Sequence, residues 1–119
     1  MVMNAVLPTN ELVETHNGVK LRVLTWTPVQ SNTQIPILLV HGLASNALLW
    51  QGAAHELVNM GHVVKAVDLR GHGLSEKPDD GYDMQTVTND VAGLLRTIAA
   101  NGFERPVVIG QSWGGNVVV

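Results

Sequence analysis

A serine between glycines follows the short apolar stretch Pro106–Ile109. The segment Gly110–Gly114 reads GQSWG and matches the pattern G-x-S-x-G, with Ser112 at its centre. This spacing is typical of a strand that reverses sharply into a helix, because the glycines let the two elements approach closely. A hydroxyl at the apex of such a turn projects away from the sheet and can act as a nucleophile. The alternative is an ordinary glycine-rich turn in which the serine only caps the helix.

A second candidate group is the turn His41–Leu43, which follows another apolar run. We expect it to present the backbone amide of Leu43, while Trp113 presents a second amide beside Ser112. Such donors stabilise the charge that develops on a carbonyl oxygen under attack, and each is worth roughly 10²–10³ in rate. We interpret His41 as an organiser of the turn rather than as a general base, because a base needs an imidazole presented freely to the hydroxyl.

A third group is the segment Asp68–Ser75, which reads DLRGHGLS. We predict a tight loop in which Asp68 pairs with Arg70 and two glycines permit unusual backbone angles. The alternative makes Asp68 or His72 a catalytic partner of Ser112. We favour the structural role for this loop.

Composition excludes several classes of function. The seven Lys and Arg against ten Asp and Glu give a net charge of −3, and they form no basic patch for nucleic acid. The absence of cysteine excludes disulfides and a thiol nucleophile, and it suits the cytoplasm. No histidine pair has metal-ligand spacing and no phosphate-binding glycine loop is present, so we expect neither a bound metal nor a bound nucleotide. The longest apolar run, Ile37–Val40, is too short to span a membrane.

The pattern of apolar and turn residues predicts alternating strands and helices. Asn17-Gly18 predicts a hairpin turn, Ser45 or Asn46 is expected to cap one helix, and Asp83 another that ends before Gly102. The expected strands are Glu11–His16, Val19–Trp26, Ile35–Val40, His62–Val67 and a buried Pro106–Ile109, and a last helix opens over Asn116–Val119.

This order predicts an α/β fold, with a mostly parallel sheet, an antiparallel hairpin at its start and helices on both faces. Right-handed crossovers place the loops after parallel strands at one edge of the sheet, where ligands of such folds bind. The His41 turn and the Ser112 turn both fall at that edge, so we expect them to form one site.

Together the three motifs resemble the α/β-hydrolase superfamily, in the branch that holds esterases, haloperoxidases, C–C bond hydrolases and epoxide hydrolases. The resemblance implies a nucleophilic Ser112 with an oxyanion hole from the Leu43 and Trp113 amides, and no cofactor. It also implies structural support from His41, Gly42, Asp68, Arg70, Gly71, Gly73, Gly110 and Gly114. Because the triad of this family runs serine, acid, histidine along the chain, Asp68 is not expected to belong to it.

Epoxide hydrolases of this branch carry aspartate at the nucleophile position, whereas this sequence has Ser112. The resemblance therefore implies attack on a small carboxylic ester or related carbonyl substrate through an acyl-enzyme. A haloperoxidase-like or C–C bond hydrolase activity on the same fold stays open.

Members of the family are more than twice as long as residues 1–119, and their acid and histidine follow the serine motif. We therefore expect these residues to be an incomplete hydrolase domain that is inactive alone, with an exposed apolar edge at its last strand. The alternative is a non-catalytic binding or interaction module that keeps the first half of the fold.

Overall fold

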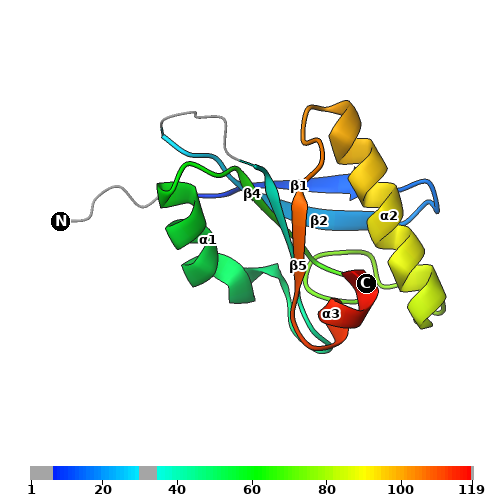
Figure 1. Cartoon of the computed structure of the whole chain (residues 1–119). Coiled ribbons are helices and arrows are strands. Elements are labelled where there is room, and N and C mark those ends of the chain that lie inside the picture. Colours follow the sequence, from blue (N-terminus) through cyan, green and yellow to red (C-terminus); the bar gives the residue numbers. More distant parts are fainter. Residues whose placement is uncertain (1–6, 30–34, 119) are drawn as a thin grey trace.

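The strands form one mixed sheet that is open at both edges. The computed structural model describes residues 7–29 and 35–118, and within them the strand order is β1-β2-β4-β3-β5 (Figure 1). The strands are β1 Thr9–Glu14, β2 Lys20–Trp26, β3 Ile37–Val40, β4 Val64–Val67 and β5 Val107–Gly110.

The predicted hairpin is confirmed. β1 and β2 pair antiparallel, with Glu14 opposite Lys20. Gly18 adopts a φ of 83°, a left-handed conformation that glycine reaches without steric cost. β2 then pairs antiparallel with β4, so the hairpin adjoins the parallel strands at β4, although β3 precedes β4 in the chain.

The three parallel strands end at the same level. Val40 of β3 pairs with Val67 of β4 on one side and with Gly110 of β5 on the other. The residues that follow these three therefore leave the sheet along one edge, as the alternation of strands and helices predicts. This alignment brings the sequence motifs to a common place.

Polar side chains start the helices between the strands. The Asn46 carboxamide accepts a hydrogen bond from the Leu48 amide at 2.9 Å, and the Asp83 carboxylate accepts one from the Thr86 amide at 3.0 Å. Val119, the end of the expected last helix, lies outside the described residues. The helical elements are η1 Ala47–Trp50 (a 3₁₀ turn), α1 Gln51–Asn59, α2 Met84–Ala100 and α3 Trp113–Val118.

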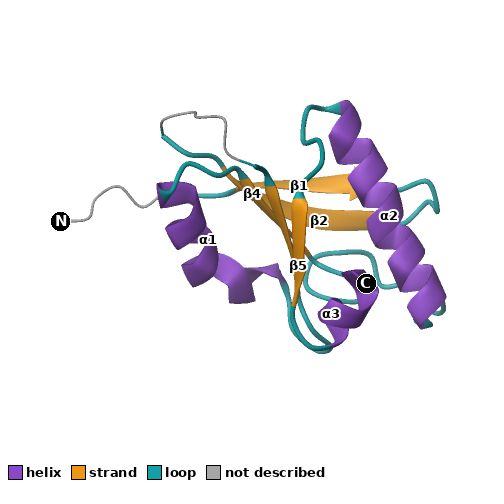
Figure 2. Cartoon of the chain, viewed as in Figure 1, coloured by secondary structure: helices purple, strands orange, loops and turns teal. Residues whose placement is uncertain are grey.

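Helices cover both faces of the sheet, as predicted (Figure 2). Successive strand residues point to opposite faces, so each strand contributes to two separate cores. One core joins the sheet to α2 and α3 through Leu21, Val23, Leu38, Val40, Val67, Val87, Val91, Leu94, Ile98 and Val117. The other joins it to α1 through Leu24, Trp26, Ile37, Leu39, Ala54, Val58, Val64 and Ala66.

β5 is not the fully buried strand that its apolar residues predict. It pairs with β3 only and forms an edge of the described sheet. Val107 is 47% exposed and Ile109 38% exposed, while Val108 packs against the core under α2 and α3. The reason is that α1 packs over β4 and β2 rather than over β5. An apolar run by itself cannot distinguish an edge strand from a central one, and the expected exposed edge is present.

Candidate active site

Ser112 lies at the apex of the turn from β5 into α3. Its side chain is exposed and its φ is 56°, a left-handed conformation that costs a residue with a Cβ roughly 1–2 kcal/mol. The turn is held by the Gln111 amide, which donates to the Val40 carbonyl at 3.0 Å, and by the Gly115 amide, which donates to the Ser112 carbonyl at 2.8 Å. Strained backbone of this kind concentrates at functional sites.

Glycine is required on both sides of Ser112, because backbone segments lie too close together there to admit a Cβ. A Cβ on Gly110 would lie 2.7 Å from the Gly115 nitrogen, and a Cβ on Gly114 would lie 2.6 Å from the Val40 carbonyl oxygen. Both distances are shorter than real Cβ atoms show. Helix α3 therefore lies against the ends of two strands, and this contact forces the sharp turn that exposes the serine.

The His41–Leu43 turn lies directly beside the serine. A Cβ built on Gly42 would lie 3.2 Å from Cβ of Ser112 and 3.8 Å from its hydroxyl oxygen. The two motifs, seventy residues apart in the sequence, thus meet at the carboxyl edge of the sheet. Within the described residues, the Leu43 and Trp113 amides find no protein acceptor. The Trp113 side chain is partly buried and packs against the core under α2 and α3.

His41 is fully buried and both of its ring nitrogens are engaged. Nδ1 lies 2.7 Å from the Gly42 carbonyl oxygen, which can only accept, so Nδ1 carries the hydrogen. Nε2 accepts a hydrogen bond from the Leu69 amide at 2.9 Å. Burial lowers the pKa of His41, an effect that the bond to the Gly42 carbonyl opposes and that neighbouring His72 reinforces. This imidazole has no nitrogen free to take a proton from Ser112.

A second histidine also contacts the loop after β3. His72 lies in the loop after β4, and its Nε2 accepts a hydrogen bond from the Ala44 amide at 3.0 Å. Its ring lies 4.9 Å from the His41 ring, centroid to centroid. Each histidine therefore binds a backbone amide of the opposite loop, and the loops after β3 and β4 are cross-linked.

Asp68 does not pair with Arg70, so that prediction is wrong. The buried Asp68 carboxylate instead accepts hydrogen bonds from Arg22 Nε at 2.7 Å, the Ala47 amide at 2.7 Å and the Leu74 amide at 2.9 Å. The reason is that its partner lies on the neighbouring strand β2, which spacing within the loop cannot reveal. With its oxygens engaged in this way, Asp68 joins β2, η1 and the loop after β4.

Arg70 pairs with Asp90, a buried residue of α2 that the sequence reasoning missed. Arg70 Nε lies 2.7 Å and Nη2 2.9 Å from the two carboxylate oxygens, and this bonding raises the pKa of Arg70. The Asn17 amide nitrogen donates to the same carboxylate at 3.0 Å. An aspartate among apolar helix positions was the only sequence signal for this network.

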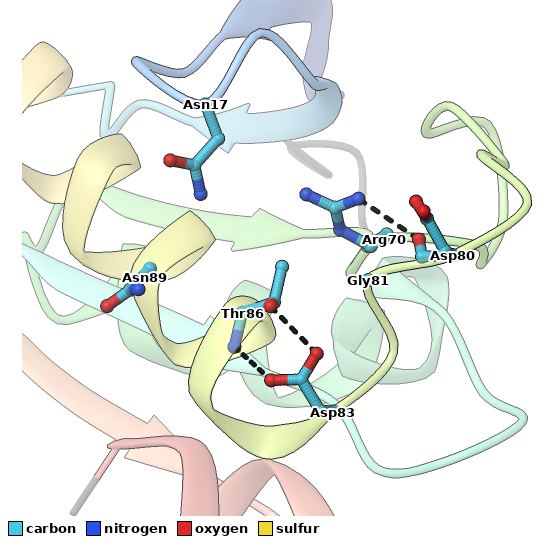
Figure 3. A pocket seen from close by; sticks show the side chains of 7 residues that line it. All are labelled: Asn17, Arg70, Asp80, Gly81, Asp83, Thr86 and Asn89. Carbon is cyan, nitrogen blue, oxygen red and sulfur yellow. Dashed lines mark hydrogen bonds between the residues drawn. The ribbon is translucent and has the colours of Figure 1, made fainter.

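Around this network lies an open depression of about 630 Å³ (Figure 3). It is bounded by Asn17 of the hairpin, by Arg70 and Gly81 of the long loop, and by the first turns of α2. The Arg70 guanidinium reaches the Asp80 carbonyl at 3.3 Å. The depression is polar and Ser112 does not line it, so it is not part of the turn that carries Ser112.

The two loop glycines have the unusual backbone that the sequence predicts. Gly71 has a φ of 79° and Gly73 a φ of 52°. A Cβ on Gly73 would lie 2.6 Å from an Asp68 carboxylate oxygen, and one on Gly71 would lie 2.8 Å from the Tyr82 hydroxyl oxygen. The loop is therefore folded tightly onto the buried carboxylate.

The described part of the chain offers no cluster of three or more His, Cys, Asp or Glu side chains that could hold a metal ion. None of its helices combines the length and the apolar character needed to cross a bilayer.

Comparison with known proteins relates the chain to a large group of enzymes. A family model described as alpha/beta hydrolase fold matches residues 35–119. Epoxide hydrolase A of Mycobacterium tuberculosis is 38% identical over 117 residues, which cover 93% of this chain and 33% of that protein. A non-heme chloroperoxidase of Streptomyces lividans is 34% identical over 106 residues, covering 89% of this chain and 36% of that protein.

Solved structures agree. The crystal structure of epoxide hydrolase A from Mycobacterium thermoresistibile has a TM-score of 0.75 and 36% identity, and the match covers 93% of this chain and 33% of that chain. The chain thus spans about a third of the length of the curated relatives that it matches.

Proposed function

The chain belongs to the alpha/beta hydrolase family, and on this premise we propose that it is the nucleophile-bearing part of a serine hydrolase that attacks esters or related carbonyl compounds. The observation that carries the proposal is the placement of Ser112, exposed and left-handed at the strand-to-helix turn, with Gly42 beside it. A serine that only capped a helix would not need a strained backbone or a neighbouring turn with free amides.

In the proposed reaction a base removes the Ser112 hydroxyl proton while Oγ bonds to the carbonyl carbon. The π electrons of the carbonyl move to its oxygen, where the Leu43 and Trp113 amides stabilise the negative charge. Collapse of this intermediate returns the pair to the carbonyl and expels the alcohol, which takes up the proton. An ester on Ser112 remains, and water then hydrolyses it to the acid and free serine.

Neither histidine of the neighbouring loops is available as the base of this reaction. His41 and His72 lie in the loops after β3 and β4, and their ring nitrogens are engaged with backbone groups. We propose that the histidine and its acid come from a part of the protein that residues 1–119 do not contain. The length of the relatives, about three times the matched segment, supports this.

Some relatives are named for epoxides, but the chemistry of Ser112 favours a carbonyl substrate. A carboxylate that opens an epoxide forms an ester, which water can cleave. A serine that opened an epoxide would form an ether, which resists hydrolysis, so the enzyme would stop after one turnover. A serine that attacks an ester forms another ester and can turn over.

Hydrolysis assays on the intact protein that contains this chain test the proposal. We expect turnover of p-nitrophenyl butyrate and none of styrene oxide, and a loss of at least about 10⁴-fold in kcat for Ser112→Ala. Thr27→Ala is the control, because it removes an exposed hydroxyl just after β2, at the end of the sheet where the parallel strands begin and opposite to the Ser112 turn. Full activity of Ser112→Ala, or turnover of the epoxide alone, would contradict the proposal.

The same assays address the alternative of a non-catalytic binding module, for which the intact protein should hydrolyse no ester at all. We also propose that the protein works in the cytoplasm, because residues 1–119 contain no cysteine.

A further inference from the structure

His72 holds the residue next to the proposed oxyanion donor. Its Nε2 accepts a hydrogen bond from the Ala44 amide at 3.0 Å, and its Nδ1 lies 2.9 Å from the Arg70 carbonyl oxygen. Because a carbonyl oxygen only accepts, Nδ1 carries the hydrogen and Nε2 keeps a lone pair. The ring is therefore neutral and presents an acceptor to Ala44.

Two peptide planes flank Leu43, and its N–H lies in the first of them. The first plane joins Gly42 to Leu43, and its carbonyl oxygen is held by Nδ1 of His41 at 2.7 Å. The second joins Leu43 to Ala44, and its N–H is held by His72. Since only two soft backbone angles of Leu43 separate the two planes, the second plane, held by His72, limits how far the first plane and the Leu43 N–H can rotate.

The backbone conformation of Ala44 is the part of this turn that needs a contact to hold it. Its φ of 61° is left-handed, a conformation that residues with a Cβ seldom adopt. Among the described residues the acceptor for its amide is His72 alone. The Ser45 amide also closes this turn, by donating to the Gly42 carbonyl at 3.3 Å. Without the His72 acceptor the turn keeps only that long bond across it, so we expect it to relax towards an ordinary backbone and to turn the Leu43 amide with it.

We propose that His72 is a positioning residue of the Ser112 site, which orients the Leu43 amide by accepting a hydrogen bond from Ala44. This inference rests on the proposed function, because the direction of that amide affects a rate only if Ser112 attacks a carbonyl. His72 touches no reacting atom and acts through the backbone.

Three replacements of His72 in the intact protein separate its two hydrogen bonds. His72→Phe keeps a ring but removes both bonds. His72→Asn keeps a donor near Nδ1 and lacks an acceptor that reaches Ala44, whereas His72→Gln places an amide oxygen near the position of Nε2. The measurements are kcat and KM for p-nitrophenyl butyrate, the melting temperature, and hydrogen exchange of the Ala44 amide by NMR.

We expect His72→Phe and His72→Asn to lower kcat about tenfold, a part of the 10²–10³ that loss of an oxyanion donor costs, with KM changed less than about twofold. Hydrogen exchange at Ala44 should accelerate about tenfold in both. His72→Gln should recover most of the rate and of the protection. The recovery distinguishes positioning from a general loss of folding, which the melting temperature reports separately.

A wild-type kcat in His72→Phe, or a His72→Gln variant as slow as His72→Phe, would overturn the inference while leaving the role of Ser112 intact. Full activity of Ser112→Ala would instead overturn the proposed function. Unchanged exchange at Ala44 in His72→Phe would overturn the inference whatever the catalytic result.

Discussion

Replacing Asp68 by Asn should destabilise the intact protein by about 3–5 kcal/mol, the range measured when one partner of a buried ion pair is removed. The Asp68 carboxylate is fully buried, and Arg22 is only 6% exposed, so water cannot replace the lost charge. The substitution keeps the size of the side chain. It leaves the Arg22 guanidinium without a counter-charge, and it places an NH₂ group, which donates, opposite N–H groups that need an acceptor.

Urea denaturation followed by circular dichroism measures this loss. With a slope near 2 kcal/mol per molar urea, the midpoint should fall by roughly 1.5–2.5 M. Asp79→Asn is the matched control, because Asp79 is exposed and should shift stability by less than about 0.5 kcal/mol. The double variant Asp68→Asn with Arg22→Met should recover part of the loss, since it removes the unpaired cation. A midpoint for Asp68→Asn within 0.3 M of the wild type would refute the reasoning.

Two further predictions concern the turn itself. Gly114→Ala places a Cβ 2.6 Å from the Val40 carbonyl oxygen and should lower the unfolding free energy, measured by urea denaturation, by more than about 2 kcal/mol. Gly52→Ala is the control, because the space around Gly52 is open, and it should be neutral or slightly stabilising. Burial lowers the pKa of His41 below its ordinary 6.5, so the unfolded chain binds a proton that the folded chain does not. Stability should therefore be full above pH 6.5 and fall as pH drops from 6.5 towards the lowered pKa. His41→Asn should flatten that part of the curve, and an equally steep fall in this variant would assign the pH dependence to another group.

Local signals in the sequence were sufficient for the elements and for the meeting of the Gly42 and Ser112 turns. Asn17-Gly18 forms the hairpin turn, and the side chains of Asn46 and Asp83 start their helices. These features depend on neighbours a few residues away, which a sequence displays directly. The shared edge of the parallel strands followed from chain order alone.

What could not be predicted depends on contacts between distant residues. Arg22 and Asp68 are 46 residues apart, and Arg70 and Asp90 are 20 apart, so the sequence offered the closer but wrong pairing of Asp68 with Arg70. The exposure of β5 depends on where α1 lies rather than on the apolar residues of the strand.

The crossed histidine contacts were equally out of reach of the sequence. They join Ala44 to His72 and Leu69 to His41, and a sequence does not show which loop amide each ring nitrogen will contact.

The central claim, an activated hydroxyl at Ser112, is tested most directly by reacting the intact protein with a fluorophosphonate and locating the adduct by mass spectrometry. The reagent phosphonylates an activated serine with loss of fluoride, so we predict one adduct, on Ser112, that heat-denatured protein does not form. An adduct confined to other residues, or an unmodified Ser112 in a protein that still hydrolyses esters, would contradict the account.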